Sequence, residues 1–126
     1  MRYIIGACTV LVLLIGATVV NSCCMAAITD RSIGYVKESL AAEDTKDPDS
    51  AIHAAQTLDQ YWQSKRAYLE SVLMHAELDD ITVTISDFVS AAENDDTEAF
   101  RAGGRLLCVQ LQHLADLEKL RIGNVL

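Results

Sequence analysis

Two pairs of histidine and aspartate are the side chains whose types and spacing best suit metal chemistry in this chain. His75 lies four residues before Asp79, and His113 lies three residues before Asp116. Residues at these spacings share one face of a helix, so each pair can offer one nitrogen and one oxygen to a divalent cation. Two such pairs facing each other would supply four ligands. The simpler alternative is a histidine paired with a carboxylate for structure; we favour it, and expect neither a metal nor a cofactor.

A second set of side chains could form a surface for a ligand or a protein partner. Trp62, the only tryptophan, precedes Lys65 and Arg66 by about one helical turn. An exposed tryptophan beside two cations would make such a platform, whereas a buried one would anchor helix packing, with the Lys and Arg stems over its edges. The buried arrangement is the more usual. The complete candidate surface comprises Trp62, Lys65, Arg66, His75, Glu77 and Asp79.

The sequence contains no motif for catalysis. It has no GxSxG nucleophile motif, no HExxH metal motif and no CxxC pair. Cys108 is the only cysteine after residue 29, and its apolar neighbours indicate a buried structural thiol rather than a nucleophile. We therefore expect no catalytic residues and no enzyme activity.

The N-terminal residues are suited to a lipid bilayer. The 27 residues from Tyr3 to Thr29 include no Asp, Glu, Lys, Arg or His. As a helix, Tyr3 to Val20 alone would extend about 27 Å, close to the roughly 30 Å of a hydrocarbon core. We assign residues 1–29 to a transmembrane anchor that contacts lipid through residues 3–28, and residues 30–126 to an acidic helical domain. Because an uncleaved export signal keeps its N-terminus in the cytoplasm, we expect this domain outside the cytoplasmic membrane.

A lipoprotein signal is the alternative for this segment. Val20-Asn21-Ser22-Cys23 loosely resembles the bacterial lipoprotein pattern, in which the cysteine is lipidated and becomes the new N-terminus. Asn21 departs from that pattern, since a small or aliphatic residue is usual at its position. The plain alternative is that Cys23 and Cys24 are small, soft side chains near the lipid interface.

The charge of the chain excludes nucleic acid as a partner. Nine of the ten Lys and Arg and all eighteen Asp and Glu follow Thr29, a surplus of nine negative charges in that part. Binding to nucleic acid needs a basic stripe that displaces counterions from phosphates. Lys65-Arg66 is the only adjacent basic pair and is too small for this purpose.

Helices are the elements that must position these side chains. From residue 50 to 93 there is neither Gly nor Pro, and apolar residues recur mostly at steps of three, four or seven. We predict helices over residues 31–43, 50–93 and 97–121. The β-branched run at 81–86 would suit a strand, but without a partner strand elsewhere we keep it helical. The expected fold is all-α: an N-terminal transmembrane helix continuing into a short helix, then a long antiparallel hairpin, in a three-helix arrangement.

Several short motifs, taken in order, resemble a known family. They are Trp62-x-x-Lys65-Arg66-x-x-Leu69, then His75-x-Glu77-Leu78-Asp79-x-Ile81, an acidic break at 93–98, and the ending Leu120-Arg-Ile-Gly-Asn124-Val-Leu126. With the apolar N-terminus, this order is similar to a family of short bacterial proteins classed as a domain of unknown function. The resemblance covers nearly the whole chain. It implies an N-terminally anchored, all-helical protein without an assigned activity.

These observations favour a single-pass bacterial membrane protein that acts as a non-enzymatic interaction or structural module at the cell surface. Its partner would be an unidentified protein or a second copy of the chain. The alternative is an extracytoplasmic protein that binds a ligand or a metal through the His75/Asp79 region, with a lipoprotein anchor as a further option.

Overall fold

The protein is helical throughout the part that the structure describes. The computed structural model describes residues 1–125 and contains no strand in that range. The all-α prediction is therefore confirmed. The helices are α1 (Arg2–Asp44), α2 (Pro48–Ser64), α3 (Arg66–Val72), α4 (His75–Glu93) and α5 (Thr97–Val125).

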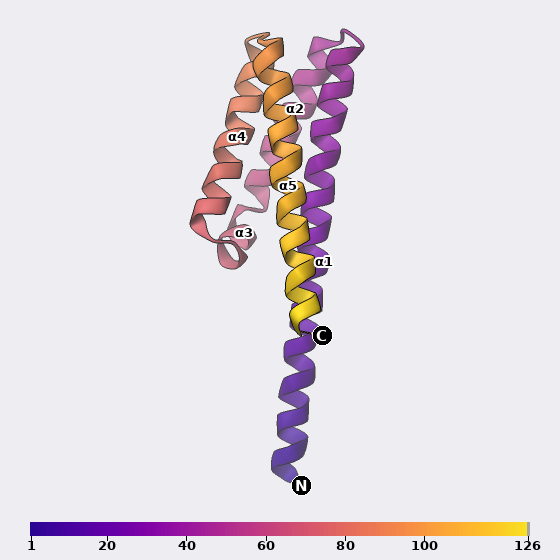
Figure 1. Ribbon diagram of the computed structural model, residues 1–126, viewed down its shortest axis with the longest axis vertical. Coiled ribbons are helices and arrows are strands. Elements are labelled where there is room, and N and C mark those ends of the chain that lie inside the picture. The colour runs from indigo at the N-terminus through magenta and orange to yellow at the C-terminus, as the bar shows by residue number, and fades with distance from the viewer. Residues whose placement is uncertain (126) are drawn as a thin grey trace.

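Four of these helices form an antiparallel bundle. α1 packs against α2 and α5, and α4 packs against the same two helices, so the four close a ring around one core. Figure 1 shows that α1 and α4 run in one direction and α2 and α5 in the other, while α1 extends well beyond the rest. Short connections between consecutive helices give this up-down-up-down order.

The prediction of a single helix over residues 50–93 is wrong. The chain forms α2, α3 and α4 there, so the bundle contains four helices rather than the three expected. The chain breaks at Lys65 and again at Leu73 and Met74, which have extended ψ angles of 153° and 141°. Ser64 and Ser71 donate hydrogen bonds to the carbonyls of Tyr61 and Tyr68, at 2.6 and 2.5 Å, which satisfies acceptors at the ends of α2 and α3. The fold-back lets both halves of this segment bury their apolar faces against each other.

Aspartates cap the first turns of α2 and α5, at the end of the bundle opposite the N-terminus (Figure 1). Asp47 accepts a hydrogen bond from the Ser50 amide at 3.2 Å, with Pro48 in the first position of α2. Asp96 accepts one from the Ala99 amide at 3.2 Å at the start of α5. These caps fix helix starts close to those expected from the sequence.

The core is built from aromatic and aliphatic side chains of all the bundle helices. Phe88 of α4 and Phe100 of α5 stack with ring centroids 4.6 Å apart. Trp62 of α2 is fully buried, and its indole Nε1 donates a hydrogen bond to Thr82 Oγ1 of α4 at 3.0 Å. The ring of Trp62 thus joins α2 to α4 through both apolar packing and a directed polar contact.

The apolar N-terminal stretch has two structural roles. Residues 2–14 are all exposed, and Figure 1 shows the start of α1 extending beyond the other helices. From Ser22 onward one face of α1 is buried: Met25, Ile28 and Thr29 are 1%, 5% and 0% exposed. The boundary expected at residue 29 therefore falls inside the bundle, because apolar residues after Val20 serve as protein core.

The two adjacent glycines of α5 meet different surroundings. A Cβ added at Gly103 would lie 3.6 Å or more from Phe88, which is ordinary contact, whereas one added at Gly104 would lie 2.8 Å from a methyl group of Leu40. We expect Gly103→Ala to raise the free energy of unfolding by about 1 kcal/mol, because alanine is the better helix former. Gly104→Ala should gain less or lose stability, since Leu40 must move. Denaturant unfolding of both variants checks this, and equal gains would contradict it.

Candidate functional site

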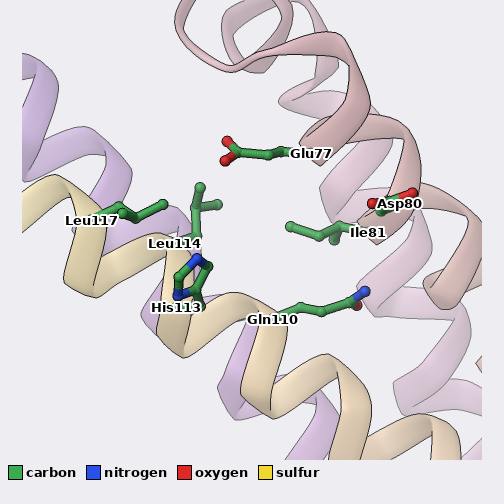
Figure 2. A pocket seen from close by; sticks show the side chains of 7 residues that line it. All are labelled: Glu77, Asp80, Ile81, Gln110, His113, Leu114 and Leu117. Atoms are coloured by element: carbon green, nitrogen blue, oxygen red, sulfur yellow. The ribbon is translucent and has the colours of Figure 1, made fainter.

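A small hollow lies between α4 and α5 and contains two of the candidate residues. Its volume is about 120 Å³. Figure 2 shows Glu77 and Ile81 reaching from α4 toward α5, and Gln110 reaching back from α5 toward α4. The hollow is lined by Glu77, Asp80, Ile81, Gln110, His113, Leu114 and Leu117.

One polar atom in this hollow lacks a partner. The amide oxygen of Gln110 is buried and accepts no hydrogen bond from any described residue. Such an atom is a position where a water or a ligand N–H binds favourably. The Glu77 carboxylate and the His113 imidazole lie on the same lining. Much of the remaining lining is apolar, from Ile81, Leu114 and Leu117, so a molecule bound here would meet this one buried acceptor within a largely apolar space.

The two His/Asp pairs do not come together as a four-ligand site. Within residues 1–125, the structure holds no group of three or more His, Cys, Asp and Glu placed to bind a metal ion. His75 and Asp79 are exposed at the start of α4, and they share a helical face with Thr82, which meets α2. That face is turned away from α5 and His113. Asp116 instead accepts a hydrogen bond from Gln112 at 3.1 Å.

Trp62 is not part of an exposed ligand surface, because it is fully buried. The nearby cations contact other groups. Lys65 Nζ lies 5.7 Å from the ring centroid of Tyr61, and the Arg31 guanidinium lies 5.6 Å from it. Arg66 pairs with Glu70 at 3.0 Å. The candidate surface is thus divided between the core and separate surface contacts.

Tyr61 is the centre of a cluster of aromatic and cationic side chains that was not predicted from the sequence. Its ring contacts Arg31 and Lys65 and packs edge-on to Tyr35 with a centroid distance of 5.6 Å. Burial raises the pKa of the Tyr61 hydroxyl, although the nearby Arg31 opposes this shift. No local pattern in the sequence indicates this cluster, because Arg31 and Tyr35 belong to α1, whereas Tyr61 lies in the last turn of α2 and Lys65 directly follows that helix.

A polar cluster joins three helices where α1 leaves the bundle. The Tyr68 hydroxyl of α3 donates to the backbone and side-chain oxygens of Asn21, the first of them at 3.1 Å. The Asn21 amide donates to Glu118 Oε1 at 3.4 Å, and Arg121 lies 3.5 Å from the other carboxylate oxygen. The Glu118 side chain is 11% exposed. We call these four residues the base cluster; its one signal in the sequence was Asn21, an amide within an apolar run.

The cysteines are all free thiols. Cys23 and Cys24 are exposed on the turn of α1 that follows Asn21. Cleavage before Cys23, as the lipoprotein alternative requires, would remove Asn21 from the base cluster. Cys108 is half-buried, and burial raises the pKa of its thiol, although Lys37 opposes this effect. A raised pKa keeps this thiol protonated and unreactive.

The Tyr68 hydroxyl makes stability sensitive to alkaline pH. Burial raises its pKa above the ordinary 10.0, and Cys24 and Glu118 add to the shift. A raised folded-state pKa means that the contribution of Tyr68 is complete below pH 10 and is lost as pH rises further. We expect Tyr68→Phe to lower the free energy of unfolding by about 1 kcal/mol at neutral pH and to flatten its fall above pH 10.

Tyr3→Phe is the matched control for this experiment, because Tyr3 is 92% exposed. Denaturant unfolding of the full-length protein in detergent, repeated across the alkaline range, measures the effect. An alkaline fall that is equally steep in Tyr68→Phe and Tyr3→Phe would contradict the assignment.

Comparison with known proteins adds a family to this geometry. No curated protein and no solved structure matches the chain. One family matches residues 24–125, and its description is a domain of unknown function, DUF4363. The matched range begins at Cys24 and so coincides with the bundle rather than with the exposed start of α1. The resemblance inferred from the sequence motifs is confirmed: the chain belongs to the DUF4363 family.

Proposed function

We propose that this protein is a single-pass membrane protein that holds a non-enzymatic four-helix module at the outer surface of the cytoplasmic membrane. The observation that carries the proposal is the exposed apolar start of α1. This helix is long and apolar enough to cross a membrane, and none of its most apolar part is buried in the protein. Large side chains such as Ile4, Val12 and Leu13 are 67–68% exposed. Soluble monomers rarely expose so large a continuous apolar surface.

The distribution of charge supports this placement. The turns at Glu43–Asp49 and at Glu93–Glu98 each carry four acidic residues. Figure 1 shows both turns at the end of the bundle opposite the N-terminus. Anionic lipid attracts basic segments and repels acidic ones. A bundle held by α1 therefore keeps its most acidic end farthest from the lipid headgroups.

An interaction role is favoured over catalysis by the chemistry of the surface. Among residues 1–125, the exposed His75/Asp79 region has no convergent partners, and burial raises the pKa of the Cys108 thiol. General acid, base or nucleophilic catalysis needs groups within hydrogen-bond reach of each other. A protein partner or a second copy would instead contact the outer helix faces, where Val83, Leu106 and Val109 are 50–66% exposed.

A ligand-binding role is the second candidate, and the α4–α5 hollow favours it. The unpartnered Gln110 oxygen, the Glu77 carboxylate and the His113 imidazole line one small space. These groups favour a ligand site on the α5 side of α4 over one at His75 and Asp79. A thermal-stability screen against small polar metabolites separates this role from a purely protein-binding one, because a ligand that binds the folded state raises Tm.

Two charges placed within the exposed start of α1 test the anchor. We expect Leu11→Arg with Leu13→Arg to cost about 5–7 kcal/mol of membrane insertion and to move the protein out of the membrane fraction. Leu106→Arg with Val109→Arg is the matched control, because these side chains are similarly exposed, at 50% and 66%, but lie on the bundle. Ultracentrifugation without detergent reads the result. Unmodified protein that stays in the supernatant would overturn the proposal.

Thiol labelling on intact cells tests the orientation. We expect Glu98→Cys, in the exposed first turn of α5, to gain label from a membrane-impermeant maleimide above the level of the native cysteines. Arg2→Cys lies at the N-terminal end of α1, and it should gain label only after the membrane is permeabilised. The reverse pattern would place the bundle in the cytoplasm.

A further inference from the structure

A groove lies beside the base cluster, where α1 leaves the bundle. Its volume is about 640 Å³. Three helices form its walls: α1, the last turn of α3 and the C-terminal part of α5. Figure 1 shows the C-terminal end of α5 beside α1 at this level, with the rest of α1 continuing past it. The lining residues that matter here are Leu14, Ala17, Asn21, Ser71, Glu118 and Arg121.

The two ends of this groove differ in polarity. Leu14 and Ala17 belong to the exposed apolar start of α1, and Leu14 is 61% exposed. Asn21 and Glu118 form the polar end together with the guanidinium of Arg121, which reaches back from the next turn of α5 to the Glu118 carboxylate. If the hydrocarbon core begins near Arg2, then about 28 Å of helix places Asn21 close to its opposite surface. The apolar end of the groove then lies at acyl-chain depth, and the polar end at headgroup depth.

Arg121 gives the polar end its capacity for an anion. Its side chain is 65% exposed, and one guanidinium nitrogen lies 3.5 Å from Glu118. A guanidinium has five N–H donors in a planar fork that suits phosphate oxygens. One contact with a carboxylate occupies a small part of that fork. The Glu118 charge is also hydrogen-bonded by the Asn21 amide, on the side of α1.

We propose that this groove binds one phospholipid, with its phosphate diester at Arg121 and an acyl chain along Leu14 and Ala17. The inference rests on the proposed membrane anchoring and adds a specific lipid site to it. A free anion would use the polar end alone and leave the apolar wall exposed. A lipid matches both ends, and it lies at the depth where the groove is placed.

Lipid retention by the full-length protein tests this site. Native mass spectrometry after release from detergent, with added dioleoylphosphatidylglycerol, counts the lipids that stay bound. We expect one retained lipid for the unmodified protein and about tenfold weaker retention for Arg121→Gln, because a charge-assisted contact is lost. Lys119→Gln is the matched control: the same charge is removed two residues away, from an exposed side chain outside the groove. Equal retention by Arg121→Gln and Lys119→Gln would overturn the proposal.

A second variant and two further probes keep the result independent of folding defects. Ala17→Phe keeps the Arg121 charge and adds bulk to the apolar wall of the groove, so it should also weaken retention while Tm stays unchanged. Dioleoylglycerol, which lacks the phosphate, should not be retained, and inorganic phosphate should not displace the lipid. Retention of dioleoylglycerol to the same extent, or displacement of the lipid by phosphate, would overturn the site.

Membrane anchoring is measured separately, by separating the membrane and soluble fractions of cells that express each variant. Membrane-bound protein with equal lipid retention in all variants refutes the lipid site alone. Protein that fractionates as soluble refutes both the site and the anchor.

Discussion

The continuity of α1 is the constraint on which the rest of the structure depends. One helix of 43 residues passes from an exposed apolar segment into the core of a bundle without a break. A helix satisfies its own backbone hydrogen bonds in either environment, so no loop is needed at the boundary. Hydroxyl groups follow the same rule: Thr9 and Thr18 donate to carbonyls four residues earlier, at 2.8 and 2.9 Å. The direction of α1 therefore sets the direction of the whole bundle.

Helical phase could be predicted from the sequence, whereas helix length could not. The apolar residues that recur at helical steps between residues 50 and 93 include Leu58, Trp62, Ile85 and Phe88, and all four are fully buried. The breaks at Lys65 and Leu73–Met74 lack the Gly or Pro that local rules require for an end. The fold-back at α3 brings Leu58 and Trp62 of α2 into the same core as Ile85 and Phe88 of α4, which one straight helix could not do. Only the tertiary arrangement carries the preference for this fold-back.

Sites within one helix were also easier to predict than sites between helices. The spacing of His75 and Asp79 correctly implies one shared face, but it does not say which neighbour that face meets. The rotation of α4 turns Glu77 rather than His75 toward α5. The base cluster is harder still, since its contacts join residues 47 and 97 positions apart. Such pairings depend on how helices rotate and slide in the bundle, which a single sequence does not encode locally.

The base cluster has a consequence for how deep α1 sits. An apolar helix packed on apolar neighbours could slide by a turn at small cost, because one aliphatic contact replaces another. Sliding by one turn would bring Thr18 to the level of Asn21, and Glu118 would then lose its amide donor. The contact with Arg121 would remain, because both residues belong to α5, but the loss of one hydrogen bond to a largely buried carboxylate costs about 1–3 kcal/mol. Together with the buried hydrogen bond from Ser39 to the Ala51 carbonyl at 2.7 Å, the contacts of Asn21 with Tyr68 and Glu118 favour one register of α1, and that register fixes how much apolar helix remains outside the bundle.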